Sequence, residues 1–254
     1  MIRIAGRPAD IQALAAGLPP GGTESVTLAA MAAGQTVYDY REPEELLFEL
    51  SLRAATVQAA LELEQSGMGF AVFRRSRCNP AFWRRTPQGG FVLLPGVRPS
   101  AAILDIFENG QAYATECATA IVIIFYRAML YVFPAPLFDR VFPSITLLNW
   151  RNVDPLFRGV GRMSPEKEFL PGDRRYFVNP DVNPETPQWR GENVIQLRND
   201  LFFGHGIGVG SSAALIRELN RNRAPGSQQT ASLLPEAGRP DYRRLYTLRQ
   251  GYNG

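Results

Sequence analysis

Cys117 is the side chain whose surroundings most clearly suggest chemistry. It precedes a long apolar run, and residues 115–131 are predicted to form a buried central helix. At the start of a helix, unpaired amide groups and the positive end of the helix dipole favour a thiolate. A thiolate is the form of cysteine that attacks acyl carbons. The alternative is a small buried cysteine that only fills space, and the local sequence leaves both interpretations open.

Glu116 directly precedes Cys117 and acts on the thiol in the opposite sense. A neighbouring ionised carboxylate raises the pKa of a thiol, whereas the helix end lowers it. We therefore expect the resting thiol to be protonated and to need a base that removes its proton. Without a catalytic role, Glu116 would be a favourable charge at a helix start, which is a common arrangement.

His205 is the only histidine, so any chemistry that needs an imidazole depends on it. It lies between Gly204 and Gly206, which leave the ring uncrowded at the end of an expected strand. Following Cys117 in the chain, it would orient or assist the thiol. The alternative is a turn histidine with a satisfied hydrogen bond. The glycines do not open a βαβ unit, which argues against a phosphate-binding loop.

Glu192 is a candidate general base or acid, just ahead of another expected strand. Its neighbour Asn193 would orient a partner by hydrogen bonding, and Trp189 would wall off a site. The alternative is a solvated turn carboxylate paired with Arg190, a contact that contributes little energy.

The counts of the reactive residue types exclude several kinds of site. The 254 residues include one histidine, the two cysteines Cys78 and Cys117, and a single lysine, Lys167. These are too few for a zinc site of four cysteines or of paired cysteines and histidines, or for a disulfide framework. No acidic calcium-loop spacing occurs either, so we expect no metal and no cofactor. With 27 basic and 24 acidic residues the net charge is only +3, and we expect no nucleic-acid partner.

Cys78 follows a cluster of arginines that would lower its pKa and make it reactive. No second motif supports this role, so we interpret Cys78 as incidental. The arginines at 74, 75, 77, 84 and 85 would bind an acidic partner or, as we favour, line a solvated strand face. The shortage of lysine matches the Ala-, Arg-, Gly- and Pro-rich composition that a GC-rich genome encodes.

Helices are expected first along the chain and mostly strands afterwards, which indicates an α+β fold rather than a parallel βαβ array. The expected helices cover 43–65, 100–108, 115–131 and 211–222. The expected strands cover 69–75, 81–85, 91–94, 145–150, 175–178, 193–197 and 200–203.

The two ends differ in composition from the middle. Residues 1–41 are rich in Ala, Gly and Pro, and residues 223–254 in Pro, Gly, Ser, Gln and Arg. We expect a loosely attached N-terminal extension, a catalytic domain over 42–222, and a flexible C-terminal extension. The start shows no signal-peptide pattern, and 117–133 is too interrupted for a membrane span. We therefore expect a cytoplasmic chain with reduced thiols and no membrane partner.

Three segments together resemble one family. They are Glu108-Asn-Gly-x-x-Tyr-Ala-x-Glu-Cys-Ala-Thr-Ala-Ile-Val-Ile-Ile, Gln188-Trp-Arg-Gly-Glu-Asn-Val-Ile and Phe203-x-His-Gly-Ile-Gly. They are similar to the bacterial spore-coat (sporulation) transglutaminases, which are protein-glutamine gamma-glutamyltransferases. Shorter matches at 47–50, 66–73 and 172–180 keep the order, so the likeness spans about residues 44–222.

The resemblance implies a papain-like (NlpC-type) core, in which a central buried helix carries the nucleophile and packs on a mainly antiparallel sheet. It implies a calcium-independent acyltransferase that forms ε-(γ-glutamyl)lysine cross-links through a cysteine thioester, with release of ammonia. The partners would be glutamine- and lysine-bearing spore-coat proteins. The enzyme would be a monomer made in the mother-cell cytoplasm and assembled on the spore coat.

By the same resemblance, the catalytic residues are Cys117 as nucleophile, Glu192 as principal acid and base, Glu116 as a second carboxylate, and His205 as an assisting residue. The substrate-binding residues near a tunnel to the thiol would be Phe70, Trp150, Tyr176, Trp189 and Asn193. Two rival interpretations remain. One is an NlpC-type cysteine peptidase or amidase that uses a Cys117–His205 pair, and the other is a coat structural protein with an inert cysteine.

Overall fold

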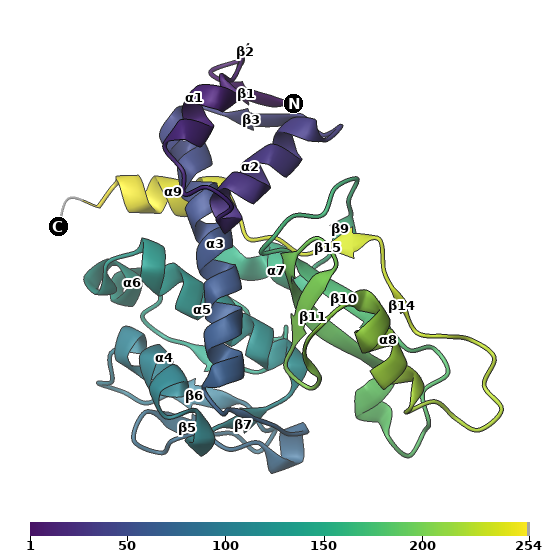
Figure 1. The fold of residues 1–254 in the computed structure, drawn as a ribbon. Coiled ribbons are helices and arrows are strands. Elements are labelled where there is room, and N and C mark those ends of the chain that lie inside the picture. The colour runs from purple at the N-terminus through teal and green to yellow at the C-terminus, as the bar shows by residue number, and fades with distance from the viewer. Residues whose placement is uncertain (253–254) are drawn as a thin grey trace.

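Two long helices, α3 (Pro43–Gln65) and α5 (Cys117–Val132), pack against each other at the centre of the computed structural model, which describes residues 1–252 (Figure 1). Helix α3 begins with proline in its first turn and carries Glu44 and Glu45 there, which complement the positive helix end. Helix α5 is buried from Ala118 through Tyr126. Both helices begin within two residues of the expected positions.

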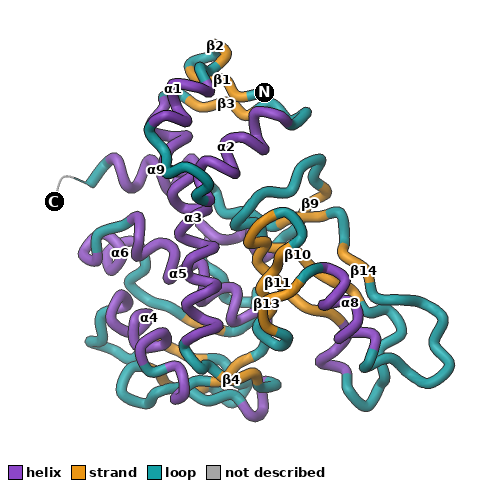
Figure 2. Tube along the Cα trace, viewed as in Figure 1, coloured by secondary structure: helices purple, strands orange, loops and turns teal. Residues whose placement is uncertain are grey.

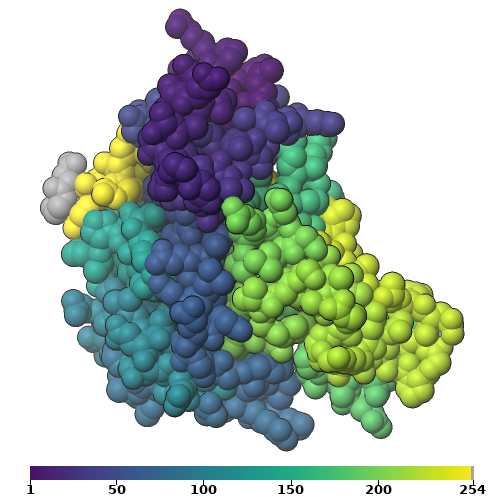
Figure 3. All heavy atoms as spheres, in the orientation of Figure 1, coloured from purple at the N-terminus to yellow at the C-terminus, as the bar shows by residue number. Residues whose placement is uncertain are grey.

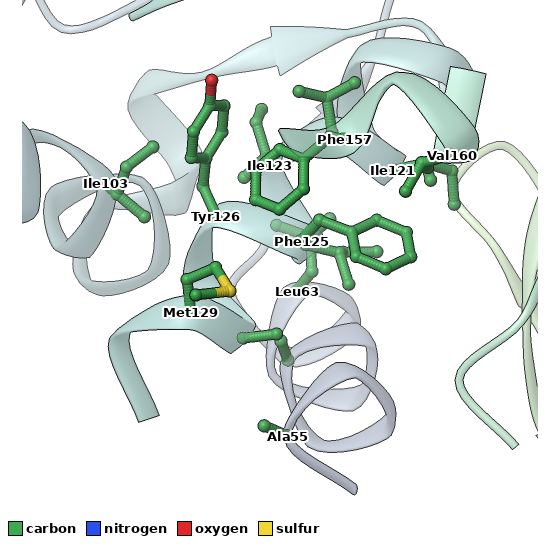
Figure 4. Close-up of a cluster of buried hydrophobic side chains, with 14 of the residues drawn as sticks. Ala55, Leu63, Ile103, Ile121, Ile123, Phe125, Tyr126, Met129, Phe157 and Val160 are labelled. Atoms are coloured by element: carbon green, nitrogen blue, oxygen red, sulfur yellow. The ribbon is translucent and has the colours of Figure 1, made fainter. Parts of the chain in front are cut away.

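The main hydrophobic core surrounds α5. It is closed by α4 (Pro99–Glu108), α6 (Ala135–Val141), η3 (Pro155–Phe157) and α7 (Arg158–Gly161). The rings of Tyr126 and Phe157 meet edge to face with centroids 5.0 Å apart, a favourable geometry for aromatic pairs (Figure 4). Because α5 is buried on nearly all sides, its first residue has a fixed place in the molecule.

A five-stranded sheet lies beside the helices (Figure 2). Its strand order is β13-β12-β11-β10-β14, and every neighbouring pair is antiparallel. Its strands are β10 (Arg174–Val178), β11 (Gly191–Arg198), β12 (Leu201–Gly204), β13 (Gly208–Gly210) and β14 (Ser232–Leu233). Along β11, Ile195 joins the main core, whereas Val194 packs under α8 (Ser212–Asn220). This alternation, expected for a strand covered on both faces, puts the sheet between α5 and α8.

Short strands place the remaining site segments. The parallel pair β4 (Gly69–Phe70) and β7 (Ala114–Thr115) sets Phe70 opposite Thr115, two residues before Cys117. A second small sheet joins β5 (Trp83–Arg85), β6 (Phe91–Leu93) and β8 (Thr146–Leu147). The turns η1 (Phe73–Arg75), η2 (Gly110–Ala112) and η4 (Pro187–Arg190) connect these elements.

Two expected strands are shorter than the sequence indicates. Only Gly69–Phe70 of 69–75 is extended, because the Arg85 guanidinium donates to the carbonyls of Phe73 and Arg74 and holds a 3₁₀ turn there. The expected strand 145–150 ends at Leu147, and Asn149 adopts a positive φ of 40°. The other expected elements agree in type and shift by a few residues at their ends.

The N-terminal segment forms a lobe at one end of α3 (Figure 3). It contains β1 (Ile2–Ile4), β2 (Arg7–Pro8), α1 (Ile11–Ala16), α2 (Thr23–Ala33) and β3 (Tyr38–Tyr40). Leu28 and Met31 of this lobe are fully buried against Leu46 and Leu50 of α3. The segment is therefore packed, whereas we expected it to be loosely attached.

The C-terminal segment is also packed. Strand β15 (Glu236–Ala237) pairs with β9 (Ser164–Pro165), and α9 (Tyr242–Gln250) places Leu245 and Tyr246 in the main core. The Arg239 guanidinium donates to both oxygens of the buried Asp173. The amino-acid composition showed that this segment is rich in turn-forming residues. It did not show that a few apolar and charged side chains of the segment pack against the rest of the protein. The domain boundaries at 42 and 222 stay a prediction.

Among the helices of residues 1–252, none has the length and apolar character needed to cross a membrane.

Candidate active site

Cys117 is the first residue of α5, and β11 packs beside it. The thiol is half-buried, and Asn193 Nδ2 on β11 donates a hydrogen bond of 3.3 Å to Cys117 Sγ. The helix and the sheet therefore meet at the sulfur, where a fixed amide donor faces a group that becomes negative during acyl transfer.

Glu116 caps the helix that begins at Cys117. Its carboxylate accepts hydrogen bonds from the amides of Ala118, at 2.6 Å, and Thr119, at 2.8 Å, and from the Thr119 hydroxyl. Thr119 Oγ1 also accepts from the amide of Asn149 at 2.8 Å, which ties the loop carrying Trp150 to the helix start. Burial raises the pKa of Glu116, although these hydrogen bonds act to lower it. Glu116 is thus a structural cap as well as a charge beside the thiol.

Glu192 is 2% exposed at the start of β11. It accepts a hydrogen bond of 3.1 Å from the Gly206 amide, and its charge raises the pKa of the Cys117 thiol. Burial raises the pKa of Glu192 to about 8, with a contribution from the charge of Glu116. A Cβ at Gly204 would lie 2.9 Å from Glu192 Cγ, so the site needs glycine there. This carboxyl exists in both protonation states near neutral pH, as a group that moves protons must.

The Cys117 thiol has a pKa well above its ordinary value. Burial is the main cause, and the charges of Glu192 and Glu116 add to it, while hydrogen bonds from Asn193 oppose it. These effects outweigh the lowering of the pKa that the helix start would cause. The resting group is therefore the protonated thiol, as we expected. Its attack on a substrate requires transfer of its proton to a neighbouring base.

His205 is turned toward β4. Its Nε2 lies 3.1 Å from the carbonyl oxygen of Gly69, and burial lowers the pKa of the imidazole to about 4. The ring is consequently neutral at physiological pH, and Nε2–H donates to that carbonyl. Among the hydrogen bonds of residues 1–252, the one described to Cys117 Sγ comes from Asn193 and not from the imidazole. An assisting role for His205 stays a prediction.

The aromatic residues expected to bind substrate lie on four different segments around the thiol. Phe70 is 38% exposed and stacks on Trp189 with ring centroids 6.5 Å apart. Tyr176 on β10 lies opposite Asn193 on β11. Burial, together with the charge of Cys117, raises the pKa of Tyr176. Trp150 packs under the Arg174 guanidinium, 4.0 Å from its ring centroid. The fold thus brings all nine expected site residues to one region.

Arg174 and Thr119 are site neighbours that sequence reasoning missed. Arg174 donates two hydrogen bonds to Asn193 Oδ1, and Thr119 links the Glu116 carboxylate to the Asn149 amide. Arg174 lies within the 172–180 match, but we expected no role for it. A pair of adjacent arginines at the start of the strand expected over 175–178 was the available signal, since one of two neighbouring strand residues faces the covered side of the sheet.

Cys78 lies away from this cluster. Its Sγ is 3.7 Å from the Trp83 carbonyl oxygen, and burial raises its pKa to about 11 although Arg85 acts in the other direction. The cation cluster therefore does not activate this thiol, which agrees with the incidental interpretation. Both cysteines are free. Within residues 1–252, no group of three or more His, Cys, Asp or Glu side chains is arranged to hold a metal ion.

A thiol at the head of a buried helix, with two carboxyls of raised pKa beside it, is typical of enzymes that transfer acyl groups through a cysteine. This is the class of protein that the fold and the site indicate. The protein-glutamine gamma-glutamyltransferase family model matches residues 1–249, and the chain belongs to this family of transglutaminases.

Relatives and a solved structure agree with this assignment. The chain is 45% identical over 218 residues to the protein-glutamine gamma-glutamyltransferase of Bacillus mycoides (strain KBAB4), covering 86% of this chain and 78% of that protein. It is 45% identical over 216 residues to that of Bacillus cereus (strain G9842), covering 85% and 77%. A transglutaminase from Geobacillus stearothermophilus, solved without its C-terminal extension, superposes with a TM-score of 0.76 at 46% identity, covering 81% of this chain and 97% of that one.

Proposed function

We propose that this transglutaminase joins protein glutamine and lysine side chains through a thioester on Cys117, without calcium, on a papain-like core. The observation that carries the proposal is the cluster at the head of α5, in which the charge of the buried Glu192 acts on the Cys117 thiol and Asn193 donates a hydrogen bond to its sulfur. A proton acceptor and an amide donor on one sulfur are what acylation of a thiol requires.

The first half-reaction forms the thioester. The Glu192 carboxylate takes the thiol proton as Sγ bonds to the γ-carboxamide carbon of a glutamine. The tetrahedral intermediate then collapses, the C–N bond breaks, and the carboxylic acid returns its proton so that ammonia leaves. The pKa of Glu192 near 8 suits both directions of this transfer near neutral pH. Glu116 lies beside the same thiol and serves as a second, less free carboxylate, because helix amides occupy its oxygens.

The second half-reaction transfers the acyl group. A neutral lysine amine attacks the thioester carbon, loses a proton to the carboxylate, and displaces Sγ, which is reprotonated as the isopeptide forms. Water in place of the amine would convert the glutamine to glutamate. Phe70, Trp189, Tyr176 and Trp150 would line the approach to the thiol and limit access of water. His205 assists by holding Gly69, and so Phe70, in place.

The core and the cellular role extend this proposal. A nucleophile at the head of a buried helix that packs on an antiparallel sheet supports the papain-like assignment. The resemblance of the motifs to spore-coat transglutaminases supports spore-coat proteins as substrates and assembly of a monomer from the mother-cell cytoplasm onto the coat. Cross-linking that persists in the presence of a calcium chelator is the expected result for a calcium-independent enzyme.

The test is incorporation of a fluorescent primary amine into a glutamine-bearing protein. Wild type and Cys78→Ala label the protein, because the second thiol lies outside the site, whereas Cys117→Ala does not. Normal labelling by Cys117→Ala would overturn the assignment of the nucleophile. Cleavage of peptide bonds without added amine would favour the peptidase interpretation, and Cys117 that resists native thiol labelling would favour the structural one.

A further inference from the structure

We propose that Arg174 is a positioning residue for the thiol chemistry, which fixes the Asn193 amide so that its Nδ2 faces the Cys117 sulfur and holds the Trp150 ring beside them. The inference rests on the proposed function for its catalytic consequence, but its structural part concerns the thiol alone. It deepens that function by assigning a role to a residue outside the set of nucleophile, carboxyls and aromatic walls.

The guanidinium of Arg174 is committed to the site by its contacts. The side chain is 5% exposed. Its Nε and Nη2 donate to Asn193 Oδ1 at 3.0 and 2.6 Å, and its Nη1 donates to the Val160 carbonyl at 2.7 Å and to that of Gly161 at 3.3 Å. Two donors therefore converge on one amide oxygen while the third anchors the guanidinium to the backbone of α7.

These contacts decide which end of the Asn193 amide meets the sulfur. A guanidinium offers only donors, so the carbonyl end of the amide must face Arg174. The NH₂ end then points to Cys117 Sγ, 3.3 Å away. The opposite orientation would set NH₂ against the guanidinium and an oxygen against the sulfur when it carries negative charge. Arg174 thus converts a side chain with two possible orientations into a fixed donor.

The electrostatic environment supports the same assignment. Among the ion pairs of residues 1–252, Arg174 has no carboxylate partner, although burial of a lone cation is costly. Burial lowers its pKa to about 10, so it remains charged at neutral pH, and a thiolate at Cys117 would act most strongly in the other direction. Negative charge on the sulfur would therefore compensate this cation.

The same guanidinium holds the aromatic wall. It lies 4.0 Å from the ring centroid of Trp150, within the range of a cation–π contact. Gly161 also lies close to this ring, since a Cβ there would be 3.5 Å from Trp150 Cε3. Loss of Arg174 is therefore expected to disturb the hydrogen bond on the sulfur and the wall of the site together.

Arg175 provides a matched control on the same strand. It is 4% exposed, and its guanidinium lies 3.4 Å from the ring centroid of Phe169. It donates to Gln196 Oε1, at 2.9 Å, and to the carbonyls of Glu236 and Leu234. Neighbouring strand residues point to opposite faces, so Arg175 repeats the burial and the stacking without the link to Asn193.

The experiment compares Arg174→Met with Arg175→Met in a Cys78→Ala background. The readouts are the rate of Cys117 alkylation by iodoacetamide between about pH 6 and about pH 10 and the steady-state amine incorporation. Arg174→Met is expected to move the alkylation profile to higher pH, by about one unit, and to slow alkylation roughly tenfold at neutral pH. It should also lower kcat/KM, whereas Arg175→Met should leave the alkylation profile in place even if it lowers Tm equally.

Two further variants keep the test decisive. Arg174→Lys retains the charge but has neither the paired donors nor the flat face, and we expect a smaller shift in the same direction. If Arg174→Met does not fold, Arg174→Lys against Arg175→Lys repeats the comparison. In an Asn193→Ala background, Arg174→Met should lose most of its effect on alkylation, because Arg174 acts through that amide.

Equal effects of the 174 and 175 variants on alkylation, or a full Arg174→Met effect without Asn193, would overturn the proposal. Failure of the proposed function would appear separately. Full amine incorporation by Cys117→Ala would reject the nucleophile, while the alkylation profiles would still report on Arg174.

Discussion

The main-chain amide of Gly206 donates a hydrogen bond of 3.1 Å to the Glu192 carboxyl. It joins the turn after the only histidine to the buried start of β11 and keeps one Glu192 oxygen engaged beside the thiol. Burial outweighs this hydrogen bond and raises the pKa of Glu192 to about 8. A carboxyl with this pKa leads to predictions for both rate and stability.

In the wild type, kcat/KM is expected to rise with pH as Glu192 ionises near pH 8. Glu192→Gln should abolish this rise and lower kcat/KM roughly 10²-fold, because the amide cannot accept the thiol proton. The measurement is the pH–rate profile of amine incorporation. Glu185→Gln, at an exposed carboxyl of the neighbouring loop, is the control and should leave the profile unchanged. A Glu192→Gln profile that keeps the same rise would remove Glu192 as the base.

The same pKa makes stability depend on pH. Native Glu192 keeps its proton up to about pH 8, whereas the unfolded chain loses it near the ordinary value of 4.5. The native state therefore binds more protons in this window, and this contribution to stability falls as the pH rises, by about 1.4 kcal/mol per unit. Glu192→Gln should lack the dependence and be the more stable protein above pH 8. Urea unfolding of both proteins across the window would show this, and parallel curves would contradict it.

Removing either carboxylate charge should lower the pKa of the Cys117 thiol, because both charges raise it. Glu116→Gln also weakens the helix cap, at a cost of roughly 1 kcal/mol. Titration of thiolate absorbance in a Cys78→Ala background would give the midpoint. An unchanged midpoint in both Glu116→Gln and Glu192→Gln would place neither carboxylate near the sulfur.

His205→Gln should retain most activity, because the glutamine amide can replace Nε2–H as donor to the Gly69 carbonyl. The variant should also resist acid better. The imidazole pKa of about 4 in the native state lies below its unfolded value near 6.5. The contribution of His205 to the stability of the wild type is therefore lost as the pH falls from about 6.5 to about 4. Amine incorporation and Tm at neutral and acid pH are the measurements. A loss of activity as large as that of Cys117→Ala would instead make the imidazole part of the chemistry.

We expect the single lysine to limit self-cross-linking. Lys167 is exposed and is the only lysine side chain that the protein offers as an acceptor. Replacing the exposed Arg74 and Arg84 with lysine should increase covalent multimers that require Cys117, visible on denaturing gels. Arg74→Ala with Arg84→Ala, which changes the same two positions without adding an amine or a glutamine, should not. Multimers that form equally in both double variants would show that acceptor supply is not limiting.

Local sequence was sufficient for the elements whose signals lie within a few residues. Proline and two glutamates at the start of α3, and an unbroken apolar run behind Glu116 in α5, predicted both helices because capping and burial of a helix face are local properties. The motif around Cys117 likewise identified the thiol, its cap and the expected family, and the family is confirmed.

Contacts between distant segments could not be predicted from the sequence. The 3₁₀ turn at Phe73–Arg75 depends on Arg85, and the packed ends depend on partners in α3 and the main core. The composition of these ends indicated flexibility. The ends are packed instead, because few apolar residues are enough once a long helix presents a face to them.

The sequence by itself determined the reactive groups of this protein: one thiol at a helix start, one histidine, two carboxyls in recognisable motifs, and one lysine. The tertiary structure decided what each group faces. It set the imidazole on the Gly69 carbonyl, buried Glu192 beside the sulfur, and turned Arg174 rather than Arg175 toward Asn193. The reason is physical: the identity of a side chain sets its chemistry, but burial and opposing charges set its pKa, and these depend on segments far apart in the chain.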